Sequence, residues 1–222
     1  MGIASFRGVQ VRAPIPSGPS RTAGFTLIEL SIVVIIIAVI AGLAGPALMQ
    51  AMAERRANQA TLDVVRLVRN ARSSAAAYGR AHLVRYDSSG LGRVDVYRGQ
   101  NNRCNDPMPG NPFLNNWGAR TATDCTNTPN CIDFVDLNES PYRTSSSQIQ
   151  LTRDGGDIQI CYEPTGVMMW RTSNGVPFSD VNDPSISGGV RFALEPQDGD
   201  GARTGVVRRV VLPLGGDARV LR

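Results

Sequence analysis

The feature that most constrains this chain is an uninterrupted run of 24 uncharged residues, 30–53. Ser31 and Gln50 are its only polar members. A helix of about 20 apolar residues crosses the hydrocarbon core of a bilayer, because each residue adds about 1.5 Å. Residues 32–40 are apolar on every face, unlike the residues of a helix that packs on a soluble core. The run therefore predicts a membrane-spanning helix.

Positive charge precedes this run. Residues 1–24 contain Arg7, Arg12 and Arg21 and no acidic residue. The positive-inside tendency then predicts a cytoplasmic N-terminus, a single pass and a C-terminal part on the other side of the membrane. A secretory signal peptide with Ala51-Met52-Ala53 as its cleavage site is the alternative. Against it, the run is long for a signal core, and Glu29 stands where a carboxylate is costly unless it is paired.

Composition excludes several classes of protein. Hydrophobic residues make up 42% of the 222 and charged residues 19%, with 23 Gly and 14 Pro, which indicates a globular, turn-rich chain and excludes collagen, coiled coil and wholesale disorder. All 23 basic residues are Arg, and beyond residue 24 the 20 that remain nearly balance the 19 acids. The net charge of +4 therefore says little by itself about nucleic acid.

A short motif stands in front of the apolar run. Gly24-Phe25-Thr26-Leu27-Ile28-Glu29-Leu30 follows the basic leader and leads directly into the run. This arrangement resembles the class III signal of type IV pilins and type II secretion pseudopilins. The resemblance implies that a prepilin peptidase removes residues 1–24 by cutting after Gly24. It also implies that the same enzyme methylates the new N-terminal amine of Phe25.

The same resemblance gives Glu29 a role in assembly. In this family, the corresponding carboxylate is proposed to pair with the N-terminal amine of a neighbouring subunit. Because an unpaired carboxylate in hydrocarbon is costly, such a pair favours a filament over the isolated subunit. The alternative is a Glu29 side chain that reaches water at the membrane interface.

The second half of the apolar run contains weak helix formers, Gly42, Gly45 and Pro46. Proline removes a helical hydrogen bond and glycine lowers helical propensity, so we expect a kink or local melting there. This stretch resembles the proline-bearing segment that loosens inside pilin filaments. A simple kink within the membrane is the alternative.

Beyond residue 53 the pattern becomes amphipathic. Small or apolar residues and one Thr recur every three or four positions, at Ala57, Thr61, Val64, Val68, Ala71, Ala75 and Tyr78. This predicts one helix with a membrane half at 25–53 and an amphipathic half at 54–80, stopping at Gly79. The intervening arginines fall largely on other faces, as a solvated or subunit-facing surface: Arg55, Arg66, Arg69 and Arg72.

From residue 83 onward the apolar period is close to two, with frequent turn residues. Short strands are predicted at 83–86, 94–97, 132–137, 149–151, 158–162, 167–170, 190–194 and 206–212. Residues 81–222 are therefore expected to form an antiparallel β domain. Residues 101–128 are too rich in Pro, Asn and Thr for a regular element and predict a long insertion loop. The fold class is α+β and pilin-like, with one long N-terminal helix packed on this domain.

Four cysteines lie in the predicted exported half: Cys104, Cys125, Cys131 and Cys161. An even number in a periplasmic domain predicts two disulfides that tie the 101–131 loop, and the sequence leaves all three pairings open. A zinc site would need closer pairs than the intervals of 21, 6 and 30 residues provide, so no metal is expected.

Three further blocks resemble the GspH/FimT pseudopilins. Residues 67–75 with Leu83-Val84 resemble the junction between the helix and the first strand, and 160–166 and 208–220 resemble two strand-plus-turn blocks. This implies a minor subunit at or near the tip of a type IV pilus or type II secretion pseudopilus, where it helps to start the filament. The implied partners are prepilin peptidase, major and other minor pilins or pseudopilins, the inner-membrane assembly platform and membrane lipid.

Residues able to carry enzymatic chemistry are few. His82 is the only histidine, and its position between helix and strand indicates a packing or hydrogen-bonding role. We expect no catalysis and no cofactor. Asp198-Gly199-Asp200-Gly201 could wrap calcium, but the position of the bidentate EF-hand glutamate is held by Arg209. A turn between strands is the favoured interpretation.

The C-terminus is locally basic, with five Arg and one acid in residues 203–222. Some FimT-type minor pilins bind DNA through such a segment, so the resemblance suggests five phosphate contacts: Arg203, Arg208, Arg209, Arg219 and Arg222. Binding of this kind weakens steeply with salt. The alternative is a solvated strand edge protected by charge, and no aromatic stacking platform accompanies the arginines.

Overall fold

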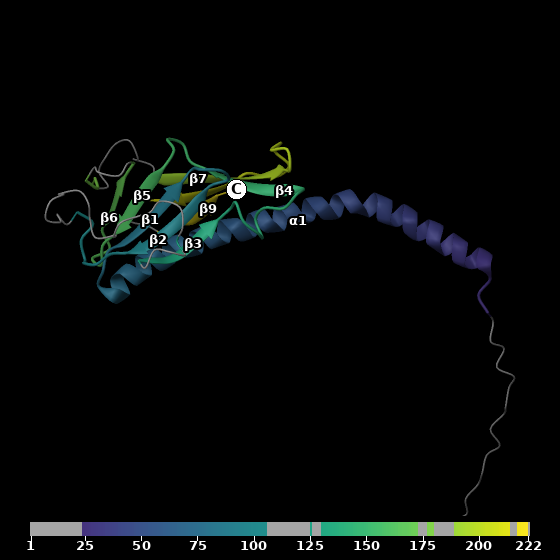
Figure 1. Cartoon of the computed structure of the whole chain (residues 1–222), viewed down its shortest axis with the longest axis horizontal. Coiled ribbons are helices and arrows are strands. Elements are labelled where there is room, and N and C mark those ends of the chain that lie inside the picture. Colours follow the sequence, from purple (N-terminus) through teal and green to yellow (C-terminus); the bar gives the residue numbers. More distant parts are fainter. Residues whose placement is uncertain are drawn as a thin grey trace, which may run out of the picture. The chain divides into compact units, whose positions relative to one another are not determined.

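The computed structural model describes residues 24–105, 125, 130–172, 177–179, 189–213 and 217–221. These residues form one long helix and two antiparallel sheets (Figure 1), which confirms the predicted α+β, pilin-like fold class. The leader at 1–23, most of the expected insertion loop, the side chain of Pro46 and Arg222 lie outside the described residues. The chain divides into two compact units, residues 1–44 and 45–222.

Helix α1 (Leu27–Tyr78) is 52 residues long. It ends where the sequence predicts, because Gly79 adopts a φ of 63°, a left-handed conformation that terminates helices and suits glycine. The helix is unbroken through Gly42, Gly45 and Pro46. The kink or local melting expected at these residues therefore remains a prediction.

The second half of α1 buries a stripe against the β domain. Most of its members are small or β-branched, which allows the helix backbone to approach the sheets closely: Ala57, Ala60, Thr61, Val64, Val65, Val68, Ala71 and Ala75, with the larger Leu67 buried among them. Tyr78 was expected in this stripe, but its side chain is 66% exposed. The stripe therefore ends at Ala75, one turn before the helix does.

The first sheet has five strands in the order β3-β2-β1-β5-β6. Their bounds lie within two residues of the predicted ones: β1 (His82–Asp87), β2 (Arg93–Arg98), β3 (Cys131–Asp136), β5 (Ile158–Tyr162) and β6 (Met168–Arg171). Strand β1 lies at the centre and pairs antiparallel with both β2 and β5. The strand that follows the helix therefore organises this sheet.

The second sheet has four strands in the order β4-β7-β8-β9: β4 (Ser147–Thr152), β7 (Val190–Asp198), β8 (Arg208–Leu212) and β9 (Arg219–Leu221). Strand β9 was not predicted. Its three residues are all exposed, and it is too short to show an alternating pattern.

The second half of α1 runs along the β domain (Figure 1), and side chains from both sheets and from this half of the helix form one hydrophobic core. Tyr86 of β1 meets Phe192 of β7 edge to face, with ring centroids 5.3 Å apart. The hydroxyl of Tyr86 donates a hydrogen bond to the carbonyl oxygen of Leu151 at 2.8 Å, and burial raises its pKa to about 12. The phenol thus joins the two sheets and stays protonated at neutral pH.

Candidate functional site

The residues of the N-terminal motif lie at the start of α1. The hydroxyl of Thr26 accepts a hydrogen bond from the backbone amide of Glu29 at 3.3 Å, which is the arrangement of an N-cap residue. The Glu29 side chain is exposed and makes no ion pair or hydrogen bond with a residue that the structure describes. Its carboxylate is therefore available to a partner outside this chain.

The apolar part of α1 is exposed over its whole circumference. Large side chains between Leu27 and Leu43 remain 45–87% accessible, including every isoleucine from Ile32 to Ile40. Within the described part of the chain, α1 is long and apolar enough to cross a membrane. Water is a poor solvent for such a surface, so this segment is consistent with membrane anchoring.

The four cysteines form two pairs. Cys104 is joined to Cys161 of β5 at a sequence separation of 57, with 6.0 Å between their Cα atoms, and both side chains are fully buried. Cys125 is joined to Cys131 at the start of β3, six residues away, with 5.3 Å between Cα atoms. The first pair therefore closes a long segment of the chain, and the second closes a short one that ends at β3, the edge strand of the first sheet.

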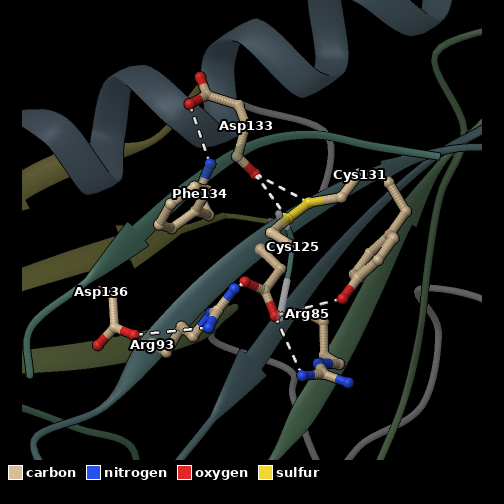
Figure 2. Close-up of a disulfide and its surroundings, with 9 residues drawn as sticks. Arg85, Arg93, Cys125, Cys131, Asp133, Phe134 and Asp136 are labelled. Atoms are coloured by element: carbon tan, nitrogen blue, oxygen red, sulfur yellow. Dashed lines mark hydrogen bonds and ion pairs between the residues drawn. A yellow bond between two sulfur atoms is a disulfide. The ribbon is translucent and has the colours of Figure 1, made fainter. Parts of the chain in front are cut away.

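A charged cluster lies next to the Cys125–Cys131 pair (Figure 2). The carboxylate of Asp95 is fully buried and pairs with Nη2 of Arg85 at 3.1 Å and with Nε of Arg93 at 2.5 Å. Arg93 also meets Asp136 at 3.5 Å. Buried carboxylates require such partners, since an unpaired charge would be strongly destabilising. This cluster is thus accounted for as a structural tie between β1, β2 and β3.

The N-terminal motif matches a known protein-family model. Residues 19–45 match the model of the prokaryotic N-terminal methylation motif. The match indicates a type IV pilin-like protein. No curated protein and no solved structure matches the chain. The matched residues include Gly24, Phe25 and Glu29, so the segment that the sequence singled out is the one the family model describes.

The basic C-terminal part of this pilin-like chain divides into buried and exposed arginines. Arg208 points inward, pairs with the Glu54 carboxylate and donates from Nε to Oδ1 of Asn58 at 2.8 Å. The hydrogen bond from Arg208 holds the pKa of Glu54 below its ordinary value. Arg203 pairs with Glu195 at 2.7 Å. These two of the five suggested phosphate contacts are therefore already engaged within the chain.

Arg209 and Arg219 face solvent on the second sheet, and Arg222 lies outside the described residues. Arg191 of β7 lies on the same face, paired with Val211, which pairs in turn with Arg219. The sequence contained the signal for Arg191, because it sits between the inward-facing Val190 and Phe192 of a predicted strand. Arg191 lies before the basic segment 203–222, so the clustering of arginines along the chain does not reveal it.

The Asp198-Gly199-Asp200-Gly201 segment is a turn between β7 and β8. Oδ1 of Asp198 accepts hydrogen bonds from the amides of Asp200 at 3.0 Å and Ala202 at 2.8 Å. This confirms the turn interpretation, since the side chain imitates a backbone turn. No group of three metal-ligating side chains occurs among the described residues.

His82 is fully buried at the start of β1. Its Nδ1 lies 3.0 Å from the carbonyl oxygen of Arg80, so Nδ1 is protonated and donates a hydrogen bond to that oxygen. Nε2 is buried with no hydrogen-bond partner in the described structure, and the ring stacks beside Tyr78. Burial, followed by the nearby positive charge of Arg98, lowers the pKa of His82, although the Arg80 carbonyl opposes this. The packing role predicted for His82 is thus consistent with its surroundings.

This buried histidine predicts a loss of stability at mildly acid pH. Because the folded-state pKa lies below the ordinary 6.5, the unfolded chain takes up the proton first as the pH falls. The free energy of unfolding should therefore decline from about pH 6.5 downward, by at most about 1.4 kcal/mol per pH unit. Thermal unfolding at pH 5–7.5 should show this slope in the wild type and a smaller one in His82→Gln. Equal slopes would contradict the prediction.

Proposed function

We propose that this chain is a minor pilin or pseudopilin of the GspH/FimT type. In this proposal it is a structural subunit at or near the tip of a type IV pilus or type II secretion pseudopilus. It is anchored in the inner membrane with its β domain in the periplasm, and it helps to start the filament and so supports pilus biogenesis or protein secretion. Its partners are prepilin peptidase, other pilins or pseudopilins, the assembly platform and membrane lipid.

One observation carries this proposal. The methylation-motif match at 19–45 ends in a helix whose large apolar side chains are exposed, while its first-turn carboxylate has no described partner. Such a helix needs two things that the described residues do not supply, an apolar environment and a positive charge for Glu29. A bilayer followed by a filament of similar helices provides both.

The periplasmic orientation rests on two properties of the chain. The three arginines before residue 25 favour a cytoplasmic N-terminus. Two disulfides in the β domain are typical of an oxidising compartment, which the periplasm is. The minor-subunit role rests on the GspH/FimT-like blocks, which fall on the helix-to-β1 junction, on β5 and on β8–β9.

The decisive experiment is the mass of the mature N-terminus. The protein is purified from cell envelopes with and without active prepilin peptidase, and its intact and N-terminal peptide masses are measured. We expect a start at methylated Phe25 that disappears without the peptidase. A start after Ala53, or an uncut Met1 in the presence of the peptidase, would overturn the proposal.

A pair of variants separates recognition from folding in this experiment. A side chain added at Gly24 or at Gly42 would meet no atom within 4 Å, so neither site needs glycine for packing. Gly24→Val should keep the leader attached, because the peptidase has to fit the residue before the cut. The same substitution at Gly42 should leave processing unchanged.

DNA binding by a FimT-like minor pilin is the second candidate function. Arg209 and Arg219 favour it, because both are exposed and make no ion pair or hydrogen bond with a described residue. Arginines of this kind can contact phosphates irrespective of sequence. With Arg203 and Arg208 bound to Glu195 and Glu54, the candidate surface is smaller than the basic segment suggested.

A further inference from the structure

The outward face of the β4-β7-β8-β9 sheet gathers arginines from four separate segments. Paired residues of antiparallel strands point to the same face. The pairing gives two rows across β7, β8 and β9: Arg191, Val211, Arg219 and Ala193, Arg209, Leu221. The inward face of the same strands holds buried Phe192, Leu194 and Val210, so these two rows face away from the core. Arg153, in the turn after β4, lines the same surface.

Most of this positive charge is not neutralised within the chain. Arg191, Arg209 and Arg219 are exposed and make no ion pair or hydrogen bond with a described residue. Arg153 donates to the carbonyl oxygen of Gly156 at 2.9 Å, and the nearby carboxylates of Asp154 and Asp157 offset part of its charge. The acidic side chain lining the hollow is Asp154. Like charges held together repel one another, so this face favours a bound anion.

The face is hollowed, and its lining mixes polar side chains with an apolar floor, by which we mean Ala193, Val211 and Leu221. A depression of about 530 Å³ lies between Arg153, Arg191 and Arg209. Ala193, Val211 and Leu221 line it together with the arginines, and Leu221 is 51% exposed. An apolar side chain of a bound segment that entered this hollow would remove its own apolar surface and that of the floor from water. The residues next to it in the bound segment would then reach the guanidinium groups.

We propose that this face binds an extended acidic protein segment in which carboxylates alternate with apolar side chains. Arginine forms paired hydrogen bonds to carboxylates, and the floor accommodates the apolar residues between them. A nucleic-acid backbone offers no apolar group for this floor, and no aromatic side chain in the described rows could stack on a base. The inference goes beyond the filament role and does not depend on it.

The test uses the full chain in zwitterionic lipid nanodiscs. The probe is a synthetic peptide of alternating Glu and Val residues, with the corresponding Gln and Val peptide as its uncharged match. Binding is followed by fluorescence anisotropy at two salt concentrations, and a DNA duplex is measured in parallel. The variant is Arg191→Ala with Arg209→Ala. The matched control, Arg66→Ala with Arg98→Ala, removes the same charge from exposed positions on α1 and β2.

We expect the acidic peptide to bind at least about tenfold more tightly than the Gln peptide, and the Arg191/Arg209 variant to lose about tenfold in affinity. The control variant should bind as the wild type does, and Lys at both positions should restore part of the loss. Equal binding of the two peptides, or equal losses in variant and control, would overturn the proposal. Arginine-dependent binding of the duplex without binding of the peptide would also overturn it and would favour the DNA function.

Discussion

Replacing Glu29 with glutamine is expected to leave the processed protein in the membrane and keep it out of filaments. Glutamine has nearly the same shape, and the hydrogen bond from the residue 29 amide to Thr26 is made by the backbone, so helix initiation should persist. The change removes only the charge that would pair with a neighbouring N-terminal amine. A charged carboxylate at membrane depth costs about 3 kcal/mol if unpaired, so pairing it could favour assembly by about a hundredfold.

The measurement compares two fractions of the same cells. Sheared filaments and membranes are assayed for the protein, and the mass of the membrane-bound form reports whether residues 1–24 were removed. Glu29→Gln should be processed as the wild type is but depleted at least tenfold from filaments, whereas Glu29→Asp should retain part of the assembly. Normal incorporation of the Gln variant would show that the Glu29 charge is not needed, and would favour a carboxylate that reaches interfacial water.

Local patterns in the sequence were sufficient for most of the fold. The helix end at Gly79 follows from glycine after an amphipathic stripe, and eight strands follow from a period of two. The predicted burial of Tyr78 was wrong, and strand β9 was not predicted. Both features depend on tertiary context. An apolar residue in the last helical turn has no sheet above it, and three exposed residues pair only because β8 lies beside them.

The candidate sites also differ in how far the sequence alone could predict them. The N-terminal motif is contiguous, so it could be found from sequence alone. The arginine face could not be assembled from sequence, because it needs the register that brings Arg191 and Arg219 into one row through Val211. The opposite fates of the neighbours Arg208 and Arg209 follow from strand alternation, in which one faces α1 and the next faces solvent. Which cysteines pair also depends on distances that separations along the chain do not contain.

Removing the Cys104–Cys161 disulfide is expected to destabilise the β domain far more than removing Cys125–Cys131. A cross-link lowers the conformational entropy of the unfolded chain, and the reduction grows with the logarithm of the number of residues in the closed loop. For separations of 57 and 6 residues this amounts to about 4 and about 2 kcal/mol of unfolding free energy. The longer pair also lies in a second apolar cluster with Leu83, Tyr97 and Phe178, so its loss loosens packing as well.

The comparison uses Cys104→Ala with Cys161→Ala against Cys125→Ala with Cys131→Ala. Each double variant leaves the other disulfide intact and no cysteine unpaired, so the two serve as controls for one another. Urea unfolding of the full chain is followed by tryptophan fluorescence, because Trp170 of β6 is buried in the main core and reports its opening. A larger loss in the Cys125/Cys131 variant would contradict the loop-length argument. It would mean that the charged cluster beside that pair, rather than the long loop, depends on a covalent tie.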